Sequence, residues 1–145
     1  QGYFLGQIWA LEKGQDQFLD ESQAVLEGHL ATMKTVAGQV GSRLALLLVP
    51  ASVQVCSPGQ LRYFPQHICL GDATRSDLAQ PQKRMAGAAV RLGIEFYDLR
   101  DVFNLTPDQC YYHPNNMHWT KEGHQVVAEF VASRLAVTTQ DENSE

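Results

Sequence analysis

The sequence contains no long apolar run and little positive charge. No stretch of its 145 residues approaches the roughly 20 apolar residues of a membrane-spanning helix, and no signal peptide is recognisable. Eleven Lys and Arg stand against sixteen Asp and Glu, which gives a net charge of −5, and no cluster of Lys or Arg occurs. These absences argue against nucleic acid and against an anionic membrane as partners. Because the chain opens at Gln1 rather than at Met, we expect it to be processed or a fragment, and its compartment stays open.

Cysteine is also scarce. Three cysteines occur, Cys56, Cys69 and Cys110, and none forms a CxxC pair. An odd count leaves at least one thiol unpaired unless another chain or segment supplies a partner. We expect buried free thiols. The alternative is a Cys56–Cys69 bridge, which would favour an extracytoplasmic location, periplasmic or secreted.

Length and composition predict a single domain with a sizeable core. Hydrophobic residues make up 44% of the chain, which is enough to bury a core in a domain of this length. We place one α/β domain, or its C-terminal part, at residues 1–137. The polar segment 138–145 is expected to be a disordered tail.

Hydrophobic periodicity predicts the secondary structure. A helix is expected over 16–40, ending at Gly41, with an apolar stripe of Leu26, Leu30, Met33, Ala37 and Val40. The uninterrupted apolar run 44–49, ended by Pro50, predicts a parallel strand buried on both faces. There follow a loop over 56–79, a helix over 81–92, a strand over 94–98 and a last helix over 120–135.

This order of elements predicts an α/β fold. Residues 44–49 and 94–97 are expected to be adjacent parallel strands, joined through the helix 81–92 in a βαβ unit. Two strands are too few for a stable sheet. We therefore expect either further strands in the weakly patterned segments or a chain that is the C-terminal portion of a longer domain.

The most informative segment is 113–124, HPNNMHWTKEGH, which leads into the last helix. Thr120 is the predicted N-cap of that helix, whose apolar positions recur at helical spacing: Val126, Val127, Phe130, Val131 and Leu135. His118 therefore lies in a loop two residues ahead of the cap, whereas His124 lies on the helix. An imidazole at such a junction can reach a substrate while the helix packs behind it.

Four segments together resemble the C-terminal half of an SGNH (GDSL-type) hydrolase. They are 47–55 (LLVPASVQV), 80–82 (QPQ), 96–100 (FYDLR) and 115–124 (NNMHWTKEGH). The nearest subgroup is the SGNH-like domains of bacterial polysaccharide O-acetyltransferases, and the resemblance covers roughly 16–136. It implies a flavodoxin-like parallel sheet between two helix layers. It also implies cofactor-free ester hydrolysis or acyl transfer at a serine.

The resemblance also assigns residues. His118 takes the place of the family's catalytic histidine, and Asn115 stands where the family has its aspartate. An amide can orient an imidazole but supplies no charge to stabilise the imidazolium, and Asp108 is the alternative orienting group. The family's Gly-Asp-Ser nucleophile motif is not found; in 71–74 (GDAT), Ala73 stands in the place of the serine. We therefore expect a missing N-terminal segment or a partner chain to supply the nucleophile.

Each candidate has a structural alternative. His118 would otherwise be a satisfied, partly buried histidine. Asn116, Trp119 and Tyr112 are expected to line a sugar-sized cleft, with core packing as the rival role. The spacing H-x4-H-x5-H of the histidines matches no strong zinc pattern, so no metal is expected.

The resulting hypothesis is an SGNH-like esterase or O-acyltransferase domain. Its partner would be an O-acylated carbohydrate or another small ester, with His118 as general base and Asn115 as its orienting partner. The alternative from another class is a non-catalytic carbohydrate-binding or scaffold domain whose catalytic triad has decayed.

Overall fold

The computed structural model describes residues 10–65, 72–106 and 108–141, which divide into two compact units. Residues 10–49 and 72–98 form the first, which we call the sheet unit. Residues 50–65 and 99–141 form the second, which we call the histidine-loop unit. The chain passes from the first unit to the second at Pro50 and again at Leu99.

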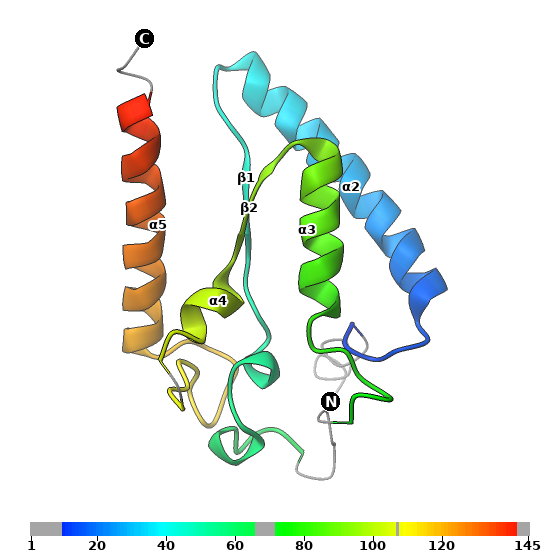
Figure 1. Cartoon of the computed structure of the whole chain (residues 1–145), viewed down its shortest axis with the longest axis vertical. Coiled ribbons are helices and arrows are strands. Elements are labelled where there is room, and N and C mark those ends of the chain that lie inside the picture. Colours follow the sequence, from blue (N-terminus) through cyan, green and yellow to red (C-terminus); the bar gives the residue numbers. More distant parts are fainter. Residues whose placement is uncertain (1–9, 66–71, 107, 142–145) are drawn as a thin grey trace. The chain divides into compact units, whose positions relative to one another are not determined.

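The sheet unit contains the predicted βαβ element (Figure 1). Strand β1 (Ala45–Leu48) pairs in parallel with β2 (Glu95–Asp98), in a register that sets Ala45 opposite Glu95. Helix α3 (Gln80–Leu92) connects to β2 and packs against both strands. The predicted parallel pair and its helix are thus confirmed.

Local chemistry explains where α3 begins and ends. Pro81 occupies the first turn, where its missing N–H costs no hydrogen bond. Gly93 closes the helix with φ +59°, a left-handed conformation that glycine adopts without strain, and the Ile94 N–H then donates to the Ala89 carbonyl at 2.9 Å. This cap turns the chain directly into β2.

The strands are less covered than predicted. We expected the run 44–49 to be buried on both faces, but β1 alternates between exposed and half-buried residues, with Leu47 36% exposed and Val49 47% exposed. The prediction was wrong because continuous apolarity indicates two covered faces only where a helix lies on each. The described part of the chain holds a two-stranded sheet, order β1–β2.

Helix α2 (Asp16–Gln39) agrees with the predicted helix and packs against α3. Of its predicted apolar stripe only Leu30 is buried, at 5% exposure. The segment ahead of α2, for which no element was predicted, pairs with the loop before α3. There the Lys13 N–H donates to the Arg75 carbonyl and the Asp77 N–H to the Leu11 carbonyl.

The histidine-loop unit is helical. It contains two single 3-10 turns, η1 (Ser52–Gln54) and η2 (Pro58–Gln60), the short helix α4 (Leu99–Phe103) and the long helix α5 (Lys121–Asp141). α4 was not predicted. α5 was predicted to end at residue 135 but continues to Asp141, so it overlaps the expected tail 138–145, whose last four residues lie outside the described part.

The core of this unit combines aromatic and aliphatic side chains. Leu61, Leu99 and Phe103 are at most 1% exposed, and Tyr111 and Tyr112 are 8% and 5% exposed. Among the described helices of both units, none is long and apolar enough to cross a membrane.

Candidate active site

A disulfide fastens the start of the candidate site. Cys56, just after η1, is bonded to Cys110, with 5.1 Å between the two Cα atoms. The expected free thiols are therefore wrong for Cys56 and Cys110, and the alternative Cys56–Cys69 bridge is wrong as well. Cys69 lies outside the described residues. The bond joins residues 54 positions apart in the sequence, a pairing that spacing alone does not indicate.

Residues 111–120, which we call the histidine loop, form a closed hairpin-like turn. The Thr120 N–H donates to the Tyr111 carbonyl at 2.8 Å, and the His113 N–H donates to the His118 carbonyl at 2.9 Å. Tyr112 and Trp119 lie opposite each other between these two bonds. The loop therefore has a fixed base, and residues 114–117 form its tip.

A second segment of the same unit supports the tip. The Arg62 N–H donates to the Pro114 carbonyl at 2.7 Å, and the Gln60 side-chain amide donates to the Asp108 carbonyl at 2.9 Å. The end of η2 and the residues after it thus contact the chain on both sides of Cys110. Together with the disulfide, these bonds hold the loop at Pro114 and the chain just before the loop at Asp108 and Cys110.

His118 lies exposed at the C-terminal side of the tip. Its backbone N–H donates to the side-chain oxygen of Asn116 at 2.9 Å, which tightens the turn. Asn115 is exposed as well, and within the described residues its side chain makes no hydrogen bond to the His118 ring. Asp108, the alternative orienting group, has φ +61° and an exposed side chain, likewise without such a bond.

Phe103 organises the aromatic residues behind the loop. Its ring stacks on Tyr111 at 5.4 Å between centroids and meets Tyr112 and Trp119 edge to face at 5.8 and 5.7 Å. Trp119 is half-buried and keeps part of its ring accessible. The structure thus brings Tyr112 and Trp119 together, but as members of one packed cluster.

Tyr112 is too buried to contact a ligand freely. Its hydroxyl donates to the Pro50 carbonyl, and burial raises the pKa of the phenol to about 12. This neutral, hydrogen-bonded phenol lies opposite Trp119 in the loop, and both rings pack against Phe103. For Tyr112 the geometry favours core packing over the lining of a cleft.

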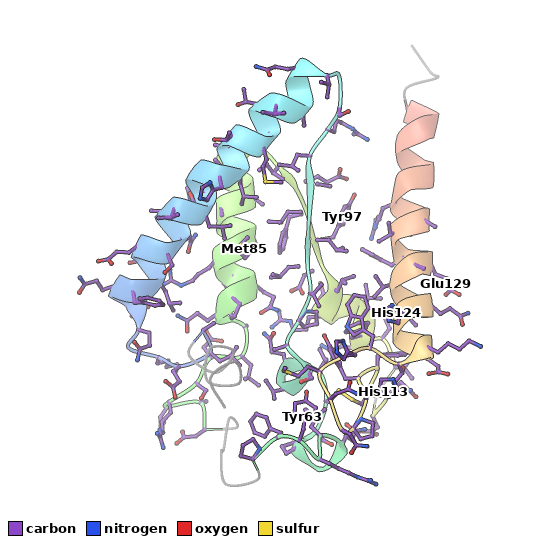
Figure 2. All side chains as sticks on the ribbon, turned by 180° about the vertical axis from the view of Figure 1, so that it is seen from behind. Tyr63, Met85, Tyr97, His113, His124 and Glu129 are labelled. Atoms are coloured by element: carbon purple, nitrogen blue, oxygen red, sulfur yellow. A yellow bond between two sulfur atoms is a disulfide. The ribbon has the colours of Figure 1, made fainter. Side chains whose placement is uncertain are left out.

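The N-terminus of α5 meets the loop closely. The Gly123 N–H donates to the Thr120 hydroxyl at 3.2 Å, so Thr120 caps the helix as predicted. A Cβ on Gly123 would lie 2.6 Å from the Tyr111 carbonyl oxygen, so only glycine fits. His124, one residue on, places its ring 5.3 Å from that of Trp119, and Figure 2 shows it beside the first turn of α5.

One polar pair in this unit was not anticipated. Ser52 is 3% exposed, and its hydroxyl is hydrogen-bonded to that of Tyr63, whose pKa is raised by burial. Because burial raises its pKa, Tyr63 stays protonated at neutral pH and cannot accept the serine proton, so this pair does not activate Ser52 as a nucleophile. Sequence gives no signal for such a pair, since both residues are common in exposed loops.

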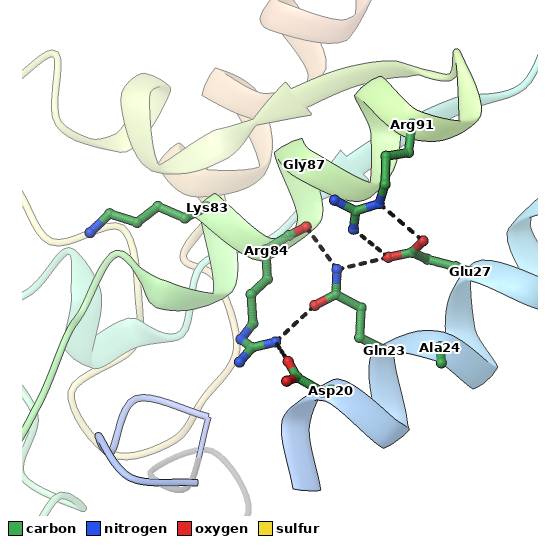
Figure 3. Close-up of a pocket in the computed structure, with 8 residues that line it drawn as sticks. All are labelled: Asp20, Gln23, Ala24, Glu27, Lys83, Arg84, Gly87 and Arg91. Carbon is green, nitrogen blue, oxygen red and sulfur yellow. Dashed lines mark hydrogen bonds and ion pairs between the residues drawn. The ribbon is translucent and has the colours of Figure 1, made fainter. Parts of the chain in front are cut away.

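The described residues contain no group of three or more His, Cys, Asp or Glu side chains arranged to hold a metal ion. A groove does occur elsewhere, between α2 and α3 in the sheet unit. Its charged side chains pair with one another, as in the ion pair of Arg91 with Glu27 at 2.6 Å (Figure 3). The groove therefore offers few free charges to a ligand.

A comparison with protein families shows which family the chain belongs to. The family model described as SGNH hydrolase-like domain, acetyltransferase AlgX, matches residues 12–145. The chain belongs to this family. The match includes the span 16–136 of the resemblance and reaches beyond it at both ends. The parallel β1–β2 pair with its connecting helix is consistent with an α/β fold of SGNH type. No curated protein matches the chain.

Proposed function

We propose that this AlgX-family domain contributes the histidine of an esterase or O-acyltransferase site that acts on O-acyl carbohydrates or related small esters. The observation that carries the proposal is the family match over residues 12–145, combined with an exposed His118 on a closed loop directly ahead of α5. A loop fixed at its base holds an imidazole in place while its ring stays accessible to a substrate.

In this proposal His118 is the general base. It accepts the proton of a serine hydroxyl while the serine oxygen attacks the acyl carbonyl carbon, and it then returns the proton to the departing sugar oxygen. The acyl-serine is attacked by water in hydrolysis or by an acceptor hydroxyl in transfer. Since the chain carries no recognisable Gly-Asp-Ser motif, we propose that the serine comes from a segment or partner outside these 145 residues.

Asn115 is proposed to orient the ring, and Asn116 and Trp119 to contact the sugar. Hydrogen bonds of catalytic groups often form only with substrate present, so the separate position of Asn115 in this structure is compatible with that role. Trp119 offers the half-exposed aromatic face that a sugar ring packs against. The aromatic cluster behind it keeps that face in place.

We also propose that further strands extend the sheet into the three-layer arrangement of the family. A two-stranded sheet is marginal by itself, and the apolar side chains of Leu47 and Val49 are 36% and 47% exposed. The disulfide between Cys56 and Cys110 supports an oxidising, extracytoplasmic location for the domain.

Substitutions at the loop test the function in the longest native polypeptide that contains this chain. His118→Ala is expected to abolish acetyl-ester turnover, because the proposal assigns both proton transfers to this imidazole. Asn115→Asp is expected to preserve or raise turnover, because a carboxylate adds the charge that stabilises the imidazolium. The matched control is His29→Ala, which removes an exposed histidine of α2 in the sheet unit that the proposal leaves outside the site.

Release of acetate from an acetylated oligosaccharide is the measurement. Equal activity of the His118→Ala variant and the native protein would exclude the catalytic role. The non-catalytic carbohydrate-binding or scaffold alternative would then stand.

A further inference from the structure

The half-exposed ring of Trp119 has its one polar group engaged inside the protein. Burial raises the pKa of Tyr112 to about 12, and a hydrogen bond that the Trp119 indole N–H donates to this phenol acts in the opposite direction. Phe103 meets the indole edge to face, with 5.7 Å between the ring centroids. Because tryptophan has no second polar group, the accessible part of this ring offers a ligand an aromatic surface alone.

A sugar on such a surface requires a polar side chain beside it. The C–H groups of the sugar pack against the indole, but the hydroxyl groups at its rim lose water, and each hydroxyl left without a partner weakens binding. The side chain that supplies the partner has to lie next to Trp119 and be open to solvent.

His124 meets both requirements. Its ring centroid lies 5.3 Å from that of Trp119, with an angle of 72° between the two planes, and the residue is exposed. Within the described part of the chain, no hydrogen bond or ion pair engages its ring nitrogens. A neutral imidazole offers one donor and one acceptor, and a charged imidazole offers two donors.

The first turn of α5 holds His124 in this place. The His124 N–H donates to the Thr120 carbonyl at 3.0 Å, and Figure 2 shows the residue beside that turn. Gly123 allows the turn to lie directly against the Tyr111 carbonyl, which a Cβ would approach to 2.6 Å. Rings held on a fixed backbone lose little freedom when a ligand binds, and this favours affinity.

We propose that Trp119 and His124 form one sugar subsite, in which the indole packs against the sugar ring and the His124 imidazole hydrogen-bonds to one of its hydroxyl groups. His124 is a substrate-binding residue in this scheme and takes no part in the proton transfers assigned to His118. The inference rests on the proposed function for its ligand, an O-acyl carbohydrate.

Isothermal titration calorimetry tests the subsite in the longest native polypeptide that contains this chain. The parent protein carries His118→Ala so that the ester is not consumed. The probes are acetylated oligosaccharides prepared from xylan, mannan and pectin, which differ in sugar and in charge. We expect at least one of them to bind.

His124→Phe is the decisive variant, because phenylalanine keeps a ring beside Trp119 but has no nitrogen. It is expected to raise the dissociation constant at least about tenfold, whereas His124→Gln, which keeps an N–H donor, should stay within about threefold of the parent. The matched control is His29→Ala, an exposed histidine of α2, which should leave the dissociation constant unchanged. The melting temperatures of these proteins should agree.

Equal affinity of the His124→Phe variant and the parent would show that the ring only packs against Trp119, and would overturn the proposal. Failure of all three probes to bind the parent would overturn it as well.

Turnover separates this inference from the proposed function. With native His118, the His124→Phe change should raise the KM for the bound oligosaccharide several-fold more than the KM for p-nitrophenyl acetate, which carries no sugar. A His118→Ala variant that stays active while His124→Phe still weakens binding would exclude the catalytic role alone. An inactive His118→Ala variant together with unchanged binding by His124→Phe would exclude the sugar subsite alone.

Discussion

Individual residues decide how tightly the histidine loop can pack against α5. Gly123 lies where the backbone of Tyr111 and the side chain of Trp119 approach the first helical turn. The closeness of this contact explains why a residue of poor helix propensity stands near the start of a long helix. The same contact transmits any shift of α5 to the residues that flank His118.

Gly123→Ala is expected to destabilise the protein by about 1–3 kcal/mol, because its Cβ would overlap the Tyr111 carbonyl oxygen and force the loop away from the helix. The matched control is Gly28→Ala in α2, where nothing lies within 4 Å of the added Cβ. That change should stabilise by up to about 1 kcal/mol through helix propensity. Urea unfolding measures both, and a similar effect of the two changes would contradict the contact.

Tyr112 makes the stability of the histidine-loop unit sensitive to alkaline pH. Burial raises its pKa from an ordinary value of 10.0 to about 12. The unfolded chain therefore loses the phenolic proton first, and the stabilisation, fully present below pH ~10, is lost as the pH rises toward ~12. Two pKa units correspond to a loss of about 2–3 kcal/mol once both states are ionised.

Tyr112→Phe is expected to remove most of this dependence. It should also cost about 1–2 kcal/mol at neutral pH, because the buried Pro50 carbonyl loses its donor. Urea midpoints at neutral pH and at several values above 10 provide the measurement. Tyr63, whose pKa is also raised by burial, should leave a residual fall of stability with rising pH in the variant. A dependence of stability on pH that is unchanged from the native protein would exclude Tyr112 as the source.

At the scale of elements, the disulfide is the main constraint on the histidine loop. It joins Cys56, just after η1, to Cys110, which lies 54 positions away and just before the histidine loop, and so closes the chain between them into a covalent ring. Irregular segments bury few backbone hydrogen bonds and are stabilised strongly by such a link. The loop therefore depends on the oxidation state of Cys56 and Cys110.

The double variant Cys56→Ser/Cys110→Ser is expected to lose about 2–4 kcal/mol of stability. Amide hydrogen exchange should increase most in residues 110–120, while α3 and the β1–β2 pair of the sheet unit change little. A reducing agent should lower the free energy of unfolding of the native chain but leave that of the double variant unchanged. Faster exchange spread evenly over both units would show that the bond does not act locally on the loop.

At the scale of the whole molecule, the 145 residues carry the proposed base, His118, and no recognisable Gly-Asp-Ser motif. None of the serines that lie outside α2 and the C-terminal segment follows a strand in the sharp turn that exposes a nucleophile; these are Ser42, Ser52, Ser57, Ser76 and Ser133. Ser52, the nearest to the end of β1, is buried and hydrogen-bonded to Tyr63. Under the proposed function, these residues supply the imidazole, and the serine that forms the acyl-enzyme comes from elsewhere.

The isolated chain is accordingly expected to hydrolyse p-nitrophenyl acetate no faster than free imidazole does. A robust turnover that one serine substitution abolishes would contradict this expectation and would place the nucleophile within the chain. The matched control is Ser133→Ala, a change on the exposed surface of α5 that should have no effect on any rate observed.

The sequence by itself determined the elements whose signals are local. The periodicity of 16–40, the apolar runs flanking the helix 81–92 and the cap at Thr120 predicted α2, the parallel pair and the start of α5, since each depends on neighbouring residues. The position of His118 ahead of a capped helix followed from the same local signals. Family-specific motifs then indicated its relatives.

Only the tertiary structure decided which distant residues meet. The Cys56–Cys110 bond joins residues 54 positions apart. The cluster around Phe103 and the close approach at Gly123 join nearer segments that no helical or strand periodicity pairs. The rotation of α2 was also invisible in its sequence, because an apolar stripe indicates a face that requires cover but not what covers it. Asp20 and Glu27 of α2 face α3 and pair with Arg84 and Arg91, and the sequence does not show which distant arginines these carboxylates meet.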